Sequence, residues 1–183
     1  YAGGTSTFSL PLDAGSGIAN GTQLRLSFDF DGNGRMFVME DRGYMLTIDA
    51  AHQREPNGLI SLHTDTDNDG VYDKHTVFID KLVFPRFLLP YGPNALLTME
   101  TDQDDIWKYT DTNGDGVADK KELFASGVGG SGNVEHQQGL LTQTMDNWLY
   151  MTVRSFRLRQ MPNGSVVRET TGNNGAQWGL TQD

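Results

Sequence analysis

The sequence predicts an all-β fold made of repeated, four-stranded antiparallel sheets. Two acidic loops with nearly the same letters recur along the chain, each between two short apolar runs. A second element, a turn of Gly, Asn or Asp before a short apolar run, recurs three times. Neither acidic loop has flanks with the apolar spacing of a helix, so strands are expected there. Together the two elements form units of about 45–60 residues, the size of one small sheet.

The acidic loops carry the pattern of a calcium-binding loop. The first starts at Asp65 and the second at Asp111, and both place oxygen-bearing side chains at positions 1, 3, 5 and 9 and Gly at position 6. A hard cation such as Ca²⁺ takes oxygen ligands in this order, with a backbone carbonyl at position 7. The expected ligands are Asp65, Asp67, Asp69, Val71 and Asp73 in the first loop and Asp111, Asn113, Asp115, Val117, Asp119 and Glu122 in the second.

Position 12 distinguishes the two loops. The second loop has Glu122 there, where an EF-hand places a bidentate carboxylate, and the first has Thr76. The sequence therefore predicts two structural calcium sites, of which the first is the weaker or more solvated. Because a short apolar run precedes and follows each loop, both are expected to connect the strands of a hairpin rather than two helices. These runs are Leu59–Leu62 and Thr76–Ile79 around the first loop, and Ile106–Tyr109 and Lys121–Phe124 around the second.

The second repeated element places a turn before a buried strand. The turns end at Gly34, Asn94 and Asn147, and an apolar run follows each of them directly. The runs are apolar at consecutive positions, so both faces of each strand are expected to be covered, as in an inner strand.

These elements combine into an incomplete β-propeller of about three blades. The units span residues 24–82, 84–128 and 135–167. An N-terminal extension (1–23) precedes them, and residues 177–183 resemble the opening strand of a fourth blade. Three blades cannot close a ring, because propellers have at least four and an open ring leaves sheet edges exposed. The rest of the propeller or a partner chain is therefore expected to complete it.

Composition excludes several classes of function. The net charge is −10 with no cluster of Lys or Arg, which argues against nucleic acid or an anionic membrane as partner. The absence of cysteine excludes disulfides, thiolate catalysis, Cys-ligated zinc and a covalently attached c-type haem from this chain. No apolar stretch approaches the roughly 18 residues of a membrane-spanning helix. Low-affinity calcium loops work where calcium is millimolar, and the first residue is Tyr1, so a processed or truncated chain in the periplasm or cell exterior is expected.

Two polar residues are candidates for a ligand site. His136 follows a Gly-rich run where a propeller loop would open the ligand pocket, and a neutral imidazole there could take the proton of a substrate hydroxyl. A hydrogen bond to a neighbouring blade is the alternative role. Arg154 could clamp the carboxylates of a cofactor or an acidic sugar, or belong to a salt-bridge network between blades. Arg157 and Arg159 fit the solvated face of a strand. The other histidines (His52, His63 and His75) are expected at the surface.

The arrangement of these segments resembles a known bacterial family. The matching segments are residues 65–78, 84–86, 99–102, 111–124, 132–137 and 146–150. They resemble large exported β-propellers described as membrane-bound dehydrogenases, which are similar to soluble quinoprotein glucose/sorbosone dehydrogenases. The resemblance covers about residues 24–183 and implies the first half of such a propeller. It also implies that a c-type haem domain or cytochrome, outside this sequence, accepts electrons.

The resemblance implies roles for a His-Gln pair. In the glucose dehydrogenases such a pair supplies the general base beside pyrroloquinoline quinone (PQQ), and His136 and Gln137 match it. The family's Trp-Gly-Pro-Asp-Gly stretch is replaced here by residues 142–147, so the turn is altered. The quinone-clamping Arg and Lys residues would mostly lie in later blades. PQQ is therefore expected only in a complete propeller.

Two classes of function remain open from the sequence. One is the propeller portion of an exported PQQ-type sugar or alcohol dehydrogenase, for which this chain would have no activity of its own. The other is a non-catalytic, calcium-dependent module that binds glycans or proteins or scaffolds a larger complex. An integrin-like calcium propeller belongs to the second class, but it lacks the segments around His136 and Trp148.

Overall fold

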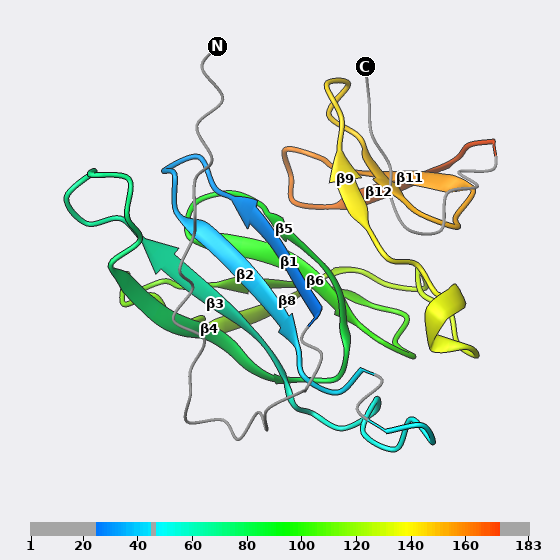
Figure 1. Cartoon of the computed structure of the whole chain (residues 1–183). Coiled ribbons are helices and arrows are strands. Elements are labelled where there is room, and N and C mark those ends of the chain that lie inside the picture. The colour runs from blue at the N-terminus through cyan, green and yellow to red at the C-terminus, as the bar shows by residue number, and fades with distance from the viewer. Residues whose placement is uncertain (1–24, 45–46, 173–183) are drawn as a thin grey trace, which may run out of the picture.

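The described part of the chain is built from three antiparallel sheets. The structure, a computed structural model, describes residues 25–44 and 47–172 (Figure 1). Each sheet contains four strands that follow one another in chain order, so each is a simple meander. The short 3₁₀ helix η2 (Val134–His136) comes after the second sheet and before the third in the chain. An all-β fold is thus confirmed, while the predicted extension (1–23) and the opening strand at 177–183 lie outside the described residues.

The strands divide equally among the sheets. Sheet 1 contains β1 (Arg25–Phe30), β2 (Met36–Asp41), β3 (Gly58–Thr64) and β4 (Lys74–Leu82). Sheet 2 contains β5 (Pro85–Pro90), β6 (Ala95–Glu100), β7 (Ile106–Thr110) and β8 (Lys120–Ala125). Sheet 3 contains β9 (Leu141–Gln143), β10 (Leu149–Met151), β11 (Phe156–Gln160) and β12 (Val166–Thr170).

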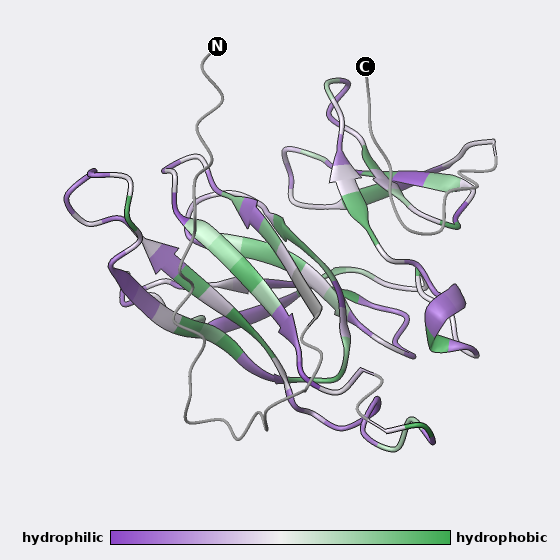
Figure 2. Cartoon of the chain, viewed as in Figure 1, coloured by the Kyte–Doolittle hydropathy of each residue, from purple (hydrophilic) through white to green (hydrophobic). Residues whose placement is uncertain are grey.

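The acidic loops connect the third and fourth strands of the first two sheets. In sheet 1, Thr64 pairs with Lys74 across the base of the loop, and in sheet 2 Thr110 pairs with Lys120. The strands predicted on both sides of each loop are therefore confirmed. Figure 2 shows the β3–β4 loop as hydrophilic and continuous with the hydrophilic ends of β3 and β4, while the middle of each strand is apolar.

The turns between the first and second strands repeat in all three sheets. Gly34, Asn94 and Asn147 have φ values of 76°, 50° and 61°, in the left-handed region that glycine and asparagine tolerate best. A backbone hydrogen bond closes each turn over the same four-residue span. These bonds run from Asp31 to Arg35, from Tyr91 to Ala95 and from Thr144 to Trp148. The sequence repeat is therefore a repeat of backbone conformation.

Two apolar clusters hold the three sheets together. The cluster between sheets 1 and 2 includes Phe37, Ile60, Leu62, Phe78, Leu88, Leu96 and Tyr109. The cluster between sheets 2 and 3 includes Phe87, Leu97, Met99, Ile106, Phe124, Leu149, Met151 and Leu158. β2 is buried along its whole length, as expected of a strand apolar on both faces. The first strands of the sheets meet, because β5 lies against β1 and β9.

Candidate functional site

The first acidic loop gathers three carboxylates around one point. Carboxylate oxygens of Asp65, Asp67 and Asp69 lie within 4.8 Å of one another. Asp65 is fixed there because its Oδ1 accepts the Asn68 amide at 2.7 Å and its Oδ2 accepts the Gly70 amide at 2.8 Å. Carboxylates this close repel each other, and a bound cation would remove that repulsion.

The second loop repeats this network of hydrogen bonds. Asp111 Oδ1 accepts the Gly114 amide at 2.6 Å, and its Oδ2 accepts the Gly116 amide at 2.9 Å. Asp115 Oδ1 accepts the Val117 amide at 2.9 Å, as Asp69 Oδ1 does from Val71 at 2.8 Å in the first loop. Burial opposes ionisation of Asp111, but backbone amides of its own loop outweigh that effect and lower its pKa.

The carboxylates at positions 9 and 12 bond side chains, whereas those at positions 1 and 5 bond backbone amides of the loop. Asp73 accepts the Thr66 hydroxyl at 2.6 Å, and Asp119 accepts the Thr112 hydroxyl at 2.7 Å. Hydrogen bonds from Thr66 lower the pKa of Asp73. Glu122 lies on β8, and its carboxylate pairs with Lys120 Nζ at 3.0 Å. Its role as a calcium ligand remains a prediction, as does that of every other expected ligand in the two loops.

The donor set of both loops fits a hard cation. Side-chain oxygens dominate, the glycines at position 6 have φ values of 91° (Gly70) and 87° (Gly116), and this conformation turns the backbone toward the carboxylates. Calcium would be held by the predicted ligands of each loop and would supply positive charge there. Magnesium demands a stricter octahedral geometry and is expected to bind these loops less well.

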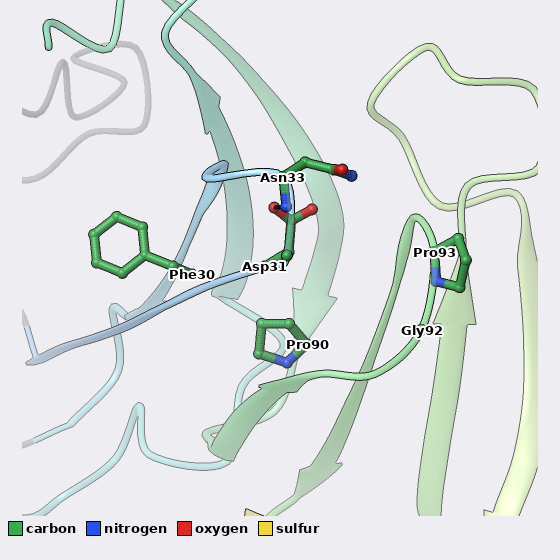
Figure 3. A pocket seen from close by; sticks show the side chains of 7 residues that line it. Phe30, Asp31, Asn33, Pro90, Gly92 and Pro93 are labelled. Atoms are coloured by element: carbon green, nitrogen blue, oxygen red, sulfur yellow. Dashed lines mark hydrogen bonds between the residues drawn. The ribbon is translucent and has the colours of Figure 1, made fainter.

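A pocket opens at the same end of the sheets as the acidic loops. Its volume is about 430 Å³, and it lies between the β1–β2 and β5–β6 turns. Figure 3 shows Asn33 and Pro93 on opposite sides of it, with Pro90 between them. Asp31 also lines the pocket, but its carboxylate is bonded to Arg35 at 2.5 Å. None of the residues predicted from the sequence as ligands or catalytic groups lines this pocket.

His136 lies in the loop between β8 and β9, at the opposite end of the sheets. It is the last residue of η2 and is exposed. Asn133 begins this short helix by accepting the Glu135 amide at 2.9 Å, and the Glu135 carboxylate accepts a hydrogen bond from the Tyr44 hydroxyl. The loop is therefore attached to the β2–β3 connection of sheet 1.

Gln137 is buried and uses its side-chain amide to hold the β6–β7 turn. Its Nε2 donates to Asp102 Oδ1 at 2.7 Å, and its Oε1 accepts the Asp102 amide at 3.0 Å. Arg54 Nε donates to the other carboxylate oxygen of Asp102 at 2.7 Å. Burial of Asp102 works against ionisation, but the bonds from Arg54 and Gln137 and the nearby charge of Arg86 outweigh it and lower the pKa of Asp102.

Two arginines hold the segment that follows His136. Arg86 is buried on β5 and donates to the Gln138 carbonyl at 2.9 Å and to the Gln137 carbonyl at 3.1 Å. Arg154 donates to the Gly129 carbonyl and, at 3.2 Å, to Gln138 Oε1. Burial lowers the pKa of Arg154. The structure thus brings Gln137 and Arg154 to the same loop as His136, with their polar groups bonded inside the chain.

Sequence reasoning missed the structural importance of Arg86, Gln138 and Asp102. A signal for Arg86 was present, because it is the single charged residue in an apolar strand and a charge at such a position must be paired. No comparable signal marks Asp102, whose partners come from loops far away in the sequence.

One surface assignment is wrong, and a second gains a contact that the sequence did not predict. His63 was expected at the surface but is 3% exposed, since it pairs across the strands with His75 and bonds Ser61 Oγ at 2.9 Å. Burial and the neighbouring His75 lower its pKa. Arg157 and Arg159 do share one strand face, but both guanidinium groups lie 4.2 Å from the ring centre of Trp148. Both side chains are half-exposed, so the face is basic and solvated, with Trp148 as a stacking partner.

The comparisons with known proteins identify a family without an assigned function. No curated protein matches the chain. Within the described part of the chain, no helix has the length and apolar character needed to cross a membrane. A family model, described as a domain of unknown function, DUF7133, matches residues 25–183. The chain therefore belongs to the DUF7133 family.

Proposed function

We propose that this chain is the calcium-stabilised portion of a β-propeller in an exported protein. The observation that carries the proposal is the repeated meander, in which each sheet of four strands packs face to face on the next and the first strands meet. This is the arrangement of propeller blades around a central axis. Phe28 and Phe30 on β1 are 58% and 44% exposed, which supports a further part of the propeller or a partner chain covering this strand.

Calcium has a structural role in this proposal. Each loop joins two strands and most of its residues are exposed, so neutralising its carboxylates would stabilise a segment that has little core of its own. The net charge of −10 would be reduced by two bound divalent cations. A periplasmic or extracellular location fits such sites, because calcium there is concentrated enough to fill loops of modest affinity.

For this chain, a non-catalytic role is the function that the geometry supports best. Two residues are candidates for holding a quinone. Gln137 already bonds Asp102, and Arg154 already bonds Gly129 and Gln138. Binding PQQ through them would break these contacts, so these two residues do not fit a ready quinone site. The chain would instead form a wall of a larger propeller that binds glycans or proteins or scaffolds a complex.

The second candidate is the propeller portion of a PQQ-type sugar or alcohol dehydrogenase. The exposure of His136 favours it, because a general base must be reachable by a substrate hydroxyl. In that case the remaining blades would supply the cationic groups that hold the quinone. Electrons would then pass to a c-type cytochrome or haem domain outside this chain.

Metal and quinone analysis separates the two candidates. The protein is purified from its native source, and its mass, calcium content and PQQ content are measured on one sample. Calcium without PQQ, and no quinone uptake on adding PQQ with Ca²⁺, is the result that we expect for a scaffold or binding module. Stoichiometric PQQ, with reduction of the quinone by a sugar or alcohol that is lost on exchanging His136→Ala, would establish the dehydrogenase instead.

A further inference from the structure

The second acidic loop is bonded to the neighbouring sheet. Thr76 lies on β4 of sheet 1, and its hydroxyl donates to the Gly116 carbonyl at 2.6 Å. The Ala118 amide donates to the Phe78 carbonyl, also on β4, at 2.9 Å. Ala118 packs against the apolar cluster between sheets 1 and 2. The second loop is thus part of the contact between two sheets.

The first loop makes its contacts differently. A Cβ atom added at Gly70 would have no neighbour within 4 Å, whereas one added at Gly116 would lie 2.6 Å from Thr76 Oγ1. Tyr72, which corresponds to Ala118, donates its hydroxyl to the Gly34 carbonyl at 2.9 Å, within its own sheet. The two loops share a sequence pattern but not their surroundings.

One peptide group links Thr76 to a predicted calcium ligand. The carbonyl of Gly116 and the amide of Val117 belong to the same planar unit, and in a trans peptide they point in opposite directions. Thr76 holds the carbonyl end, and Asp115 Oδ1 accepts the amide end at 2.9 Å. The orientation of this peptide therefore depends on Thr76 and acts on the carboxylate of Asp115.

We propose that Thr76 is a positioning residue of the second calcium loop, and that calcium there clamps sheet 1 to sheet 2. Calcium in the first loop stabilises only its own hairpin. This inference rests on the proposed calcium binding. Coupling between two events is reciprocal, so a contact that orders the loop for calcium is itself strengthened when calcium binds.

The affinity test isolates each loop in the intact chain. Asp69→Asn weakens the first loop and leaves the second to be measured, and Asp115→Asn, at the same position of the second loop, does the reverse. In the Asp69→Asn chain, Thr76→Val is expected to weaken calcium binding by about five- to tenfold, because one hydrogen bond is lost. Thr76→Ser keeps a hydroxyl and is expected to restore most of the affinity. In the Asp115→Asn chain, Thr76→Val is expected to change nothing. Isothermal titration with CaCl₂ gives all these values.

Hydrogen exchange tests the clamp itself. Calcium is expected to slow exchange of the Ala118 amide, which bonds Phe78 on the other sheet, in the Asp69→Asn chain but not in the Asp115→Asn chain. If neither chain binds calcium, the proposed calcium function fails. If the second loop binds calcium while Thr76→Val leaves its affinity and Ala118 exchange unchanged, only the positioning inference is overturned. The positioning inference is also overturned if Thr76→Val lowers the calcium affinity of the first loop alone. Thr76 would then act as the position-12 residue of the first loop.

Discussion

In each sheet, the last residue of the turn between the first and second strands shows how one residue sets a local backbone conformation. Gly34, Asn94 and Asn147 share a left-handed backbone, which costs other L-residues about 1–2 kcal/mol. Asn is tolerated there because its short polar side chain can bond the nearby backbone.

Replacing one of these asparagines tests that argument. Asn147→Ala is expected to lower the free energy of unfolding by about 1 kcal/mol, because the left-handed strain is no longer offset. Asn147→Gly is expected to stay within about 0.5 kcal/mol of the wild type, since glycine adopts this conformation freely. Urea denaturation gives both values. Equal destabilisation by the two substitutions would show that the lost side chain, rather than the backbone strain, sets the cost.

Arg86 is the buried cation on which the His136 loop depends. Replacing it with Met keeps much of the volume but leaves the carbonyls of Gln137 and Gln138 without their donor. We expect Arg86→Met to lower the free energy of unfolding by about 2–4 kcal/mol. Each of the two carbonyls left without a donor costs about 1–3 kcal/mol, and water compensates part of this cost. Arg54→Met, at an exposed ion pair, should cost less than about 1 kcal/mol. Similar losses for both variants, measured by urea denaturation, would contradict this assignment.

At the scale of elements, the strands could be predicted but the contacts between sheets could not. The apolar runs beside the acidic loops and after the three turns are local signals, and each became a strand. The burial of His63 depends on its partner on β4, and the contact of Thr76 with Gly116 depends on how two sheets pack. Neither is encoded in the period of one segment. The same holds for Gln137 and Arg154, whose partners lie in other loops.

The tie between the β6–β7 turn and the β8–β9 loop should depend on pH. The pKa of Asp102 is lowered in the folded chain, so this carboxylate contributes stability above its unfolded pKa of about 3.9, and that stability is lost as pH falls through the folded pKa. The wild type should therefore exceed Asp102→Asn in stability at pH 7, and the gap should shrink below about pH 4. The calcium ligands titrate in both proteins, so the difference isolates Asp102. A gap that is constant from pH 7 to pH 3 would contradict the ion pair with Arg54.

At the scale of the whole molecule, three repeated units and their turns could be predicted from the sequence, and the structure has three four-stranded sheets. The family has no assigned function and adds nothing to that prediction. The expected calcium ligands of each loop come from one short segment, so a sequence can predict such a site without knowledge of the fold, and calcium binding itself stays a prediction. A quinone site draws on several blades, and the described residues supply only its exposed His136. This is why the calcium prediction is sharper than the enzymatic one.

Calcium stoichiometry is the most direct test of the account. Equilibrium dialysis of the intact, EDTA-stripped chain against Ca²⁺ should give two bound ions per chain, with retention when Mg²⁺ is present in excess. Asp69→Asn and Asp115→Asn, which alter position 5 of the two loops, should each strongly weaken one site, and each calcium-bound state should melt at a higher temperature than the stripped chain. A chain that binds no calcium at millimolar concentration, or that melts at the same temperature with and without it, would contradict the central claim.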